Sequence, residues 1–440
     1  MILSGWGRVQ KLDCHVSRPT TEADVAAALA RGPAIARGNG RAYGDSALNA
    51  GNTIDMRNFN RMLAFDAARG QLTVEAGVLL GDIIQAFLPR GWFPPVTPGT
   101  KFVTIGGMIA ADVHGKNHHL HGTFGNFVDW IDVMGHDHQV YRCTPEQNSE
   151  LFNWTIGGMG LTGVILRASF RMLRVESAWI TQRLIAAQNI ADAMDIFDAN
   201  AHTTYSVAWI DCLSKGPALG RSIVMLGEHT KQSELPASLR MAPFATKPRP
   251  SVAVPADMPS ILLNKWSMRL FNETYFRRSS RSAHHGLIDW ERYFYPLDAL
   301  LKWNRIYGRR GLIQFQCALP LNRSKPGMTG ILEAISRSRT GSFLSVLKRF
   351  GQARGGLSFP MAGYTLACDF PASPDTVILM AELERLTIAN GGRLYLAKDS
   401  CMTPESIRLM EPRLAAWLGL RETNHMSEQF TSVQSERLKI

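Results

Sequence analysis

The sequence predicts an α+β protein of two domains. At 440 residues the chain is longer than one hydrophobic core usually supports. Its first third has short helices and strands joined by glycine-dense connections, whereas its middle third has strands of alternating polarity, which are typical of an antiparallel sheet. We therefore expect one domain over residues 1–177, completed by residues 393–440, and a second domain with an antiparallel sheet over residues 178–392.

Local signals predict the elements of the first third. Thr21 is placed to cap a helix that runs through an alanine-rich stretch and ends at Gly32. Residues 64–77 alternate around a turn, as a hairpin does, and residues 81–91 place apolar side chains on one helical face. Residues 164–175 then form a strand that leads out of this region. The first domain is thus expected to mix helices with short strands.

Strands dominate the prediction for the middle third, over residues 203–212, 219–226 and 312–319. The last of these alternates strictly, so Gln314 and Gln316 share one face and apolar side chains share the other. Two glutamines on one face form a hydrogen-bonding wall that suits a sugar.

Two stretches between these strands are predicted to be mobile loops. They are the proline-rich residues 247–260 and the basic residues 276–285, and periodic elements resume on both sides of each. Beyond them, Ser373 caps a helix over residues 374–390, and residues 393–400 return as a strand.

Composition restricts the class of protein. The formal net charge of +11 favours anionic partners such as phosphates, nucleic acid or acidic lipid headgroups. The six cysteines are scattered without C-x-x-C spacing, which argues against a disulfide framework and a zinc ribbon and favours a reducing compartment. Neither a signal peptide nor an apolar stretch long enough to span a membrane is recognised, so we expect a cytoplasmic protein or one peripheral on a membrane face.

The stretch "ARGNGRAYGD" at residues 36–45 has the composition of a phosphate cradle. A dinucleotide-binding Rossmann turn needs a long helix directly after its glycines, but Asn49 and Gly51 interrupt any such helix here. The lysine followed by serine or threonine of a P-loop is also absent. What remains is a nest of backbone N–H groups with arginine nearby, or else a glycine-rich surface turn.

Two further glycine-rich stretches follow, at residues 97–126 and 155–165. Three glycine-rich stretches in one domain allow close contact with backbone at three places, which indicates an extended ligand that lies along the backbone. The order and the residues of these stretches resemble the FAD domain of the vanillyl-alcohol-oxidase (PCMH) type, in which a pyrophosphate loop and a later Gly-Gly stretch enclose the dinucleotide. The resemblance thus implies FAD as the cofactor and a substrate domain with an antiparallel sheet.

A narrower resemblance extends over almost the whole chain. The strings "LSGWGR", "ARGNGRAYGDSALN", "DVHGKNHH", "FGN", "YPLD", "WNRIYG", "QFQ", "LSFP" and "GGRLYLAKDS" occur in the order found in the decaprenylphosphoryl-β-D-ribose 2′-oxidase family. Such enzymes oxidise the 2′-hydroxyl of a polyprenyl-phosphate-linked ribose to a ketone, and a separate NAD(P)-dependent reductase completes the epimerisation to the arabinose donor. We therefore expect a polyprenyl-phospho-sugar substrate and such a reductase partner. Nucleic acid is not expected as a partner.

The resemblance also implies the site residues. The cofactor-binding set is Gly38, Asn39, Gly40, Arg41, Ala42, Tyr43, Gly99, Thr104, Gly106, Gly107, His114, Ile165 and Tyr395. The catalytic pair is Lys398 and His114, and the substrate side is lined by Lys116, Trp209, Gln314, Gln316, Thr365 and Lys398. From its residue type alone, Trp209 is as well explained by a place in the hydrophobic core as by a place in the site. Without the resemblance, Lys398 would be read as a solvated lysine at the end of a strand.

Departures from the family pattern refine these expectations. Some relatives of this fold attach FAD through a histidine in the pyrophosphate loop, and Arg41 takes that place here, so the flavin is expected to be non-covalent. Ala367 stands where family members can have cysteine, and Cys368 follows it, so Cys368 is expected to face away from the cavity. Thr365 replaces an asparagine, which leaves the exact sugar and lipid chain open.

Other readings stay open at this stage. Four histidines at positions 114–121 raise the possibility of a metal, but Gly115 argues against a helix that presents them and no acidic ligand lies among them, so none is predicted. An FAD oxidase of a free sugar, alditol or aldonolactone is the alternative enzyme, and a basic nucleotide- or lipid-binding protein is the alternative without turnover. Basic loops near residues 247–260 and 277–285 are expected to contact an anionic membrane surface.

Overall fold

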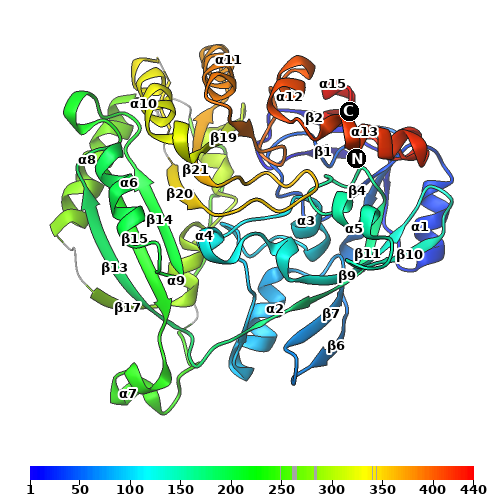
Figure 1. Ribbon diagram of the computed structural model, residues 1–440, viewed down its shortest axis with the longest axis horizontal. Coiled ribbons are helices and arrows are strands. Elements are labelled where there is room, and N and C mark those ends of the chain that lie inside the picture. Colours follow the sequence, from blue (N-terminus) through cyan, green and yellow to red (C-terminus); the bar gives the residue numbers. More distant parts are fainter. Residues whose placement is uncertain (248, 260–264, 282–284, 339, 343) are drawn as a thin grey trace.

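A computed structural model describes residues 1–440 except 248, 260–264, 282–284, 339 and 343. Two large antiparallel sheets lie side by side, with the C-terminal helices beside the N-terminal strands (Figure 1). The first sheet has five strands in the order β10-β9-β11-β7-β6, and the second has eight in the order β17-β13-β15-β14-β20-β21-β19-β22. The predicted α+β class with an antiparallel second sheet is confirmed.

The first sheet and a small parallel sheet organise the N-terminal part. The five strands are β6 (Met62–Asp66), β7 (Gln71–Glu75), β9 (Val128–Met134), β10 (Val140–Cys143) and β11 (Val164–Arg171). The parallel sheet joins β3 (Val16–Ser17), β4 (Ile35–Arg37) and β5 (Thr53–Asp55), and a two-stranded sheet joins β1 (Ile2–Ser4) to β2 (Lys11–Asp13). The helices here are α1 (Glu22–Leu29), α2 (Leu80–Phe87), α3 (Ile105–Ala110), α4 (His118–His121) and α5 (Ser149–Thr155).

The local predictions for this part are confirmed. Thr21 caps α1 through a capping box, in which its side chain accepts a hydrogen bond from the N–H of Asp24. The predicted hairpin is the antiparallel pair β6–β7, and α2 buries the apolar face expected over residues 81–91. The strand predicted over residues 164–175 exists as β11 followed by the short β12 (Leu173–Arg174).

The second sheet is covered on one face by helices. Its strands are β13 (Trp179–Ala187), β14 (Tyr205–Ile210), β15 (Ser222–His229), β17 (His285–Asp289), β19 (Leu312–Pro320), β20 (Ser345–Phe350), β21 (Gly363–Pro371) and β22 (Arg393–Leu394). The helices α6 (Ile190–Ala199), α10 (Leu321–Arg337) and α11 (Pro374–Ala389) pack against it. The apolar alternate residues of β19, β20 and β21 face these helices, so the opposite face of these three strands can build a site.

The alternation predicted for β19 is confirmed. Ile313, Phe315 and Cys317 belong to the buried cluster under the helices, while Gln314 and Gln316 point to the other face. Cys368 belongs to the same buried cluster, so it faces away from the glutamine face, as expected.

Two predictions of local structure are wrong. The basic stretch 276–285 is not a loop, because α8 (Lys265–Arg281) extends through residues 276–281 and β17 begins at His285; residues 282–284 lie outside the described ones. Residues at a spacing of four, Met268 and Asn272, are buried on one side of α8, which gives this basic segment a helical contact face. Residues 393–400 form a strand only at β22 and then turn.

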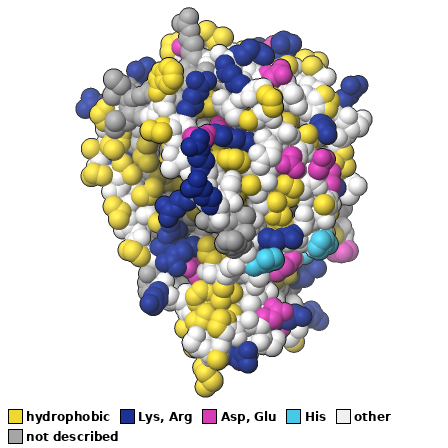
Figure 2. Space-filling model, turned by 90° about the vertical axis from the view of Figure 1, so that its left-hand side faces the viewer, with side chains coloured by type: hydrophobic (Ala, Val, Ile, Leu, Met, Phe, Trp, Pro, Cys, Tyr) yellow, Lys and Arg dark blue, Asp and Glu magenta, His cyan; other side chains and the backbone are white. Residues whose placement is uncertain are grey.

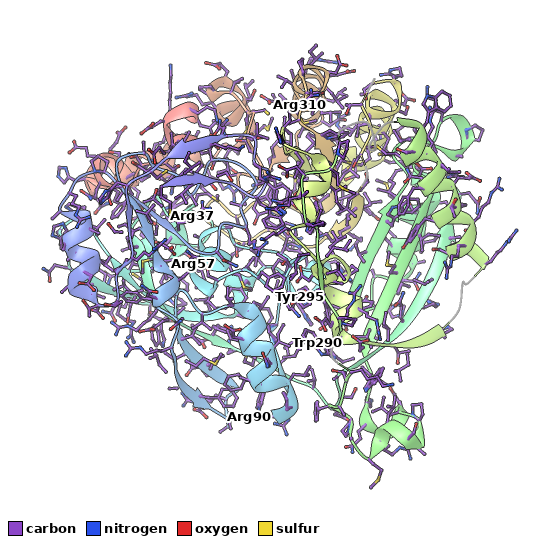
Figure 3. The ribbon with its side chains drawn as sticks, turned by 180° about the vertical axis from the view of Figure 1, so that it is seen from behind. Arg37, Arg57, Arg90, Trp290, Tyr295 and Arg310 are labelled. Atoms are coloured by element: carbon purple, nitrogen blue, oxygen red, sulfur yellow. The ribbon has the colours of Figure 1, made fainter. Side chains whose placement is uncertain are left out.

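The proline-rich stretch 247–260 is largely irregular where it is described. It contains the two-residue β16 (Val252–Ala253), which pairs with β18 (Leu300–Leu301), while residues 248 and 260 lie outside the described ones. Between α8 and β19 the chain also forms α9 (Trp290–Phe294). Figure 3 shows Trp290 and Tyr295 of this segment between the two large sheets.

C-terminal helices close the structure against the N-terminal part. They are α12 (Pro404–Met410), α13 (Leu414–Thr423), α14 (Met426–Gln429) and α15 (Val433–Leu438). Phe430 forms a bridge with Ala34, and the Arg437 guanidinium lies 2.9 Å from the carboxylate of the fully buried Asp45. These contacts join the C-terminal segment to the N-terminal part, as the prediction of a domain completed by residues 393–440 requires. The domain boundaries at residues 177 and 393 stay predictions.

Candidate active site

The first glycine-rich loop follows β4 and contains no helix, as the sequence predicted. Backbone hydrogen bonds from Trp6 N to Ala42 O (2.7 Å) and from Tyr43 N to Ala397 O (2.9 Å) hold it between the N-terminus and the C-terminal segment. Gly40 has φ +63°, a left-handed conformation that favours glycine. Figure 3 shows Arg37 at the base of this loop, where its guanidinium donates to the carbonyls of Ser4 and Ala47. The loop is therefore fixed from several sides.

The second glycine-rich stretch touches the first. A Cβ atom on Gly38 would lie 2.1 Å from the Oγ1 of Thr104, and the side chain of Asn39 donates to the carbonyl of Phe102 at 2.8 Å. Thr104 is also the N-cap of α3, where its hydroxyl accepts from the N–H of Gly107. Because only glycine permits the Gly38–Thr104 approach, the two loops form one continuous backbone surface.

Arg41 joins the two loops through its guanidinium. That group lies 4.2 Å from the Trp6 ring centroid and 5.2 Å from the Phe102 ring centroid. Burial lowers its pKa, and its Nε is buried without a hydrogen-bond partner among the described residues. A partly buried arginine with an unused donor suits an anionic ligand held by the loops.

The other predicted cofactor residues lie around this surface at different depths. Gly106 packs against Ala76, since a Cβ there would lie 2.9 Å from the Cβ of Ala76, whereas no atom lies within 4 Å of a Cβ built on Gly99. Ile165 is buried in the core on β11. The Tyr395 hydroxyl donates to the carbonyl of Ala111, just after α3, at 2.7 Å. Tyr395 thereby ties the C-terminal segment to the second loop.

His114 contacts the glutamine face of the second sheet through a fixed hydrogen-bond chain. The Thr365 hydroxyl donates to the Cys317 carbonyl at 2.7 Å, so it accepts from Nε2 of Gln316 at 3.3 Å. The same amide nitrogen lies 3.0 Å from Nε2 of His114 and donates to it. His114 therefore carries its proton on Nδ1, which is buried and has no described hydrogen-bond partner. Burial lowers the pKa of His114 well below its usual range, so the ring is neutral near pH 7.

Lys398 lies in the turn after β22, and its Nζ is 3.7 Å from the Tyr43 ring centroid. Burial lowers the pKa of Lys398 to about 7, although the nearby Asp369 acts in the opposite direction. Asp369 is fully buried on β21, directly opposite Gln314 of β19, and accepts a hydrogen bond from the Gln314 amide. Burial raises the pKa of the Asp369 carboxyl. A lysine that ionises near neutrality next to a carboxyl group can hold or release a proton.

Two residues predicted for the substrate side lie further along the same sheet face. The Lys116 ammonium donates to the carbonyl of Tyr293 and lies 4.1 Å from its ring centroid, and burial lowers its pKa to about 7. Trp209 of β14 packs against Tyr275 of α8 with ring centroids 4.7 Å apart. The structure thus brings Gln314, Gln316, Thr365, His114, Tyr395, Tyr43 and Lys398 together at the glycine loops, with Lys116 and Trp209 beyond them.

The remaining histidines of the 114–121 stretch have separate partners. His118 accepts from the N–H of Gly351, His119 contacts the carbonyl of Thr203 at 2.8 Å, and His121 contacts the amide of Asn117. No group of three histidine, cysteine or acidic side chains in the described part of the chain is arranged to hold a metal ion.

Asp369 is a site residue that sequence reasoning missed. It lies in the alternation of β21, two residues after Ala367 and four after Thr365, so the period of a strand assigns it to the glutamine face. Phe359 was also missed, and its ring stacks on Tyr395 at 4.6 Å and lies 5.7 Å from His114. No sequence signal distinguishes Phe359 from an ordinary core residue.

The joined glycine loops fit a dinucleotide. The two loops meet at Gly38 and Thr104, so their backbone N–H groups can form one surface for a pyrophosphate, and Arg41 offers an unused donor beside it. A model of the FAD-binding domain matches residues 15–144, which include both loops. The chain is therefore a flavoprotein, with FAD as its cofactor.

Comparison with curated proteins narrows the class. The chain is 36% identical over 453 residues to the decaprenylphosphoryl-β-D-ribose oxidase of Mycolicibacterium smegmatis, covering 100% of this chain and 97% of that protein. It is 32% identical to an uncharacterised protein of Streptomyces coelicolor over 82% of this chain and 100% of that protein. Mouse L-gulonolactone oxidase matches at 31% identity over only 30% of each chain. The chain belongs to the decaprenylphosphoryl-β-D-ribose oxidase family.

Proposed function

We propose that this chain oxidises the 2′-hydroxyl of a polyprenyl-phosphate-linked ribose to a ketone, the first half of an epimerisation to the arabinose donor. The main support is the sheet face on which Gln314, Gln316 and Thr365 stand beside His114, Lys398 and the glycine loops. Similarity over the whole chain to a decaprenylphosphoryl-β-D-ribose oxidase supplies the substrate class. The glycine loops would hold FAD, which would supply the hydride acceptor for the sugar carbon.

Each polar side chain has a separate part in this proposal. Lys398, whose pKa is near neutrality, takes the proton of the reacting hydroxyl. His114 cannot easily do so, because its Nε2 lone pair accepts the hydrogen bond from Gln316, and it serves instead as a neutral donor through Nδ1. Gln314 and Gln316 orient the sugar hydroxyls from the sheet face.

The alternative of an aldonolactone or free-sugar oxidase has weaker support. The L-gulonolactone oxidase match covers 134 residues, which is too few to include the whole second sheet between Trp179 and Leu394. The match to the ribose oxidase covers the whole of this sheet. The glutamine face is the part of the chain that would contact the sugar. Because the similarity to the ribose oxidase extends over this face, it favours the ribose substrate.

Identification of the product tests the proposal. The protein is incubated with farnesylphosphoryl-β-D-ribose and an electron acceptor, and the product is then reduced with borodeuteride. A 2′-ketone yields a mixture of ribose and arabinose with deuterium at C2 only. Deuterium at another carbon, or none, contradicts the proposed reaction.

A 2′-keto sugar needs a second enzyme to become the arabinose epimer. Reduction from the opposite face requires a hydride donor, and an NAD(P)-dependent reductase is the partner that this chemistry implies. Addition of such a reductase with its nicotinamide cofactor to the oxidase is expected to yield the arabino product only when both proteins are present. Formation of the arabino product by the oxidase alone would contradict the need for a partner.

The helix α8 supports contact with an anionic membrane. Its outward side exposes Trp266 (78%) and Leu270 (70%) near one end and the basic residues Arg278 and Arg281 at the other. Figure 2 shows a band of lysine and arginine side chains beside hydrophobic ones on the face to which α8 contributes. Apolar side chains that enter the headgroup region and arginines that contact lipid phosphates suit a peripheral protein with a lipid substrate. In the part of the chain that the structure describes, no helix is long and apolar enough to cross a membrane.

Liposome partitioning tests this contact. Each basic residue near an anionic surface contributes on the order of 1 kcal/mol, so Arg278→Ser with Arg281→Ser should weaken binding to anionic vesicles by about tenfold or more. The control exchanges two exposed arginines of the N-terminal part, Arg69→Ser with Arg90→Ser. Equal loss in both double variants would indicate attraction by net charge alone and would contradict docking through α8.

A further inference from the structure

Lys348 is a basic residue on the site face that no motif singled out. It lies on β20 directly opposite Thr365 of β21, the residue that fixes the Gln316 amide. Side chains alternate along a strand, so Lys348 shares its face with Phe350, whose ring lies 4.8 Å from that of His114. Lys348 therefore points toward the glutamine face rather than toward the core that the helices cover.

The Lys348 ammonium has no counter-charge in the part of the chain that the structure describes. Among the described residues it forms neither an ion pair nor a hydrogen bond, and loss of hydration lowers its pKa to about 8. Its side chain keeps partial exposure, as expected for a residue that lines a recess. A cation that is set into protein without a partner is costly, unless a ligand supplies the opposite charge.

Lys116 adds a second positive charge nearby. The Lys116 carbonyl accepts a hydrogen bond from the N–H of Ser206 at 2.8 Å, and Ser206 lies on β14, the strand that pairs with β20, so Lys116 stands beside the strand that carries Lys348. The charge of Lys348 also contributes to the lowered pKa of Lys116. Lys116 donates to a backbone carbonyl of Tyr293, and no carboxylate pairs with it in the described chain. Lys398, in contrast, has Asp369 as a neighbour. The two lysines thus form a basic site beside the glutamine face, and no carboxylate pairs with either of them among the described residues.

We propose that Lys348 and Lys116 bind the phosphate of a polyprenyl-phospho-sugar. This inference rests on the proposed function, because the substrate is taken to be a sugar phosphate diester. In such a substrate the phosphate is attached to C1, next to the C2 that is oxidised, so its oxygens lie only a few bonds from the hydroxyl that faces Lys398. Lys348 and Lys116 lie next to Thr365 and Gln316. A sugar held by the glutamine face would therefore place its C1 phosphate beside these two lysines.

Binding of farnesyl phosphate tests the site without any oxidation. Calorimetry with the FAD-loaded protein compares farnesyl phosphate, farnesol and inorganic phosphate. Because a charge-assisted hydrogen bond is lost, Lys348→Met should weaken farnesyl phosphate binding by about tenfold or more. Farnesol binding should not change, and Lys348→Arg should retain most of the affinity for farnesyl phosphate. Lys325→Met, on the exposed side of α10, is the matched control.

Three outcomes overturn the inference. They are equal affinity of Lys348→Met and the unaltered protein for farnesyl phosphate, no preference of the unaltered protein for farnesyl phosphate over farnesol, and displacement of farnesyl phosphate by inorganic phosphate at similar concentration. Lys116→Met provides a second variant, with the same expected loss. If farnesyl phosphate binds through Lys348 but farnesylphosphoryl-ribose does not reduce the flavin, the anion site is supported and the proposed reaction fails.

Discussion

Replacement of Lys398 by methionine removes the amine that we propose as the base while keeping a side chain of similar length. The ordinary lysine pKa leaves only about 0.03% of the amine neutral at pH 7. With the pKa lowered to about 7, about half is neutral, which is a gain of roughly 10³ in available base. A positioned base contributes about 10² to 10⁴ in rate, so we expect Lys398→Met to slow flavin reduction by at least ~10²-fold.

Anaerobic stopped-flow mixing with farnesylphosphoryl-β-D-ribose measures this rate directly. The variant should retain FAD, because Lys398 contacts the ring of Tyr43 rather than the backbone of the glycine loop. In the unaltered protein the rate constant should rise with pH up to about 7 and then level off, since the amine loses its proton as the pH passes its pKa. Lys325→Met, at an exposed position, should leave the rate unchanged.

Two results would refute the reasoning. Near-normal reduction by Lys398→Met would show that Lys398 is not the base. A rate that falls as the pH rises through 7 would show that the ammonium form is required, and Lys398 would then be a charged anchor of the substrate.

Three further predictions concern the flavin and the cavity. Gly38→Ala should lose most of its FAD, because the new Cβ would lie 2.1 Å from Oγ1 of Thr104, whereas Gly330→Ala, with open space around its Cβ, should keep it; equal flavin absorbance in both purified variants would contradict the close approach. Acid precipitation should release all the flavin into the supernatant, since Arg41 stands at the place of a linking histidine, and flavin in the pellet would show a covalent bond. Thiol-directed active-site ligands should not label Cys368, which is fully buried under the helices, and substrate-protected labelling of it would show a wrong strand register.

Local patterns predicted the parts of the site that lie on regular strands. The period of two in β19 placed Gln314 and Gln316 on one face, and both contact site residues in the folded chain. The same period applied to β21 assigns Asp369 to that face, so this residue was within reach of sequence reasoning. Lys348 was not, because its role depends on which strand lies beside β20.

Long-range contacts explain what the sequence did not predict. The basic composition of residues 276–281 suggested a loop, but the buried Asn272 of α8 donates to Asp211 at 2.7 Å and helps to hold the helix against the second sheet. The approach of Gly38 to Thr104 joins segments more than sixty residues apart and has no local signature. The strand expected over residues 393–400 ends early, because the chain turns after Tyr395, whose carbonyl accepts from the N–H groups of Lys398 at 2.9 Å and Asp399 at 3.1 Å.

The central claim, that this flavoprotein oxidises a lipid-linked ribose on the glutamine face, is tested most directly by anaerobic bleaching of its bound flavin. Farnesylphosphoryl-β-D-ribose, free ribose and L-gulono-1,4-lactone are each added to the FAD-loaded protein, and the absorbance of the oxidised flavin is followed. We expect complete bleaching by farnesylphosphoryl-ribose and none by the other two on the same time scale. Faster bleaching by free ribose or by the lactone, or no bleaching by farnesylphosphoryl-ribose, would contradict the account.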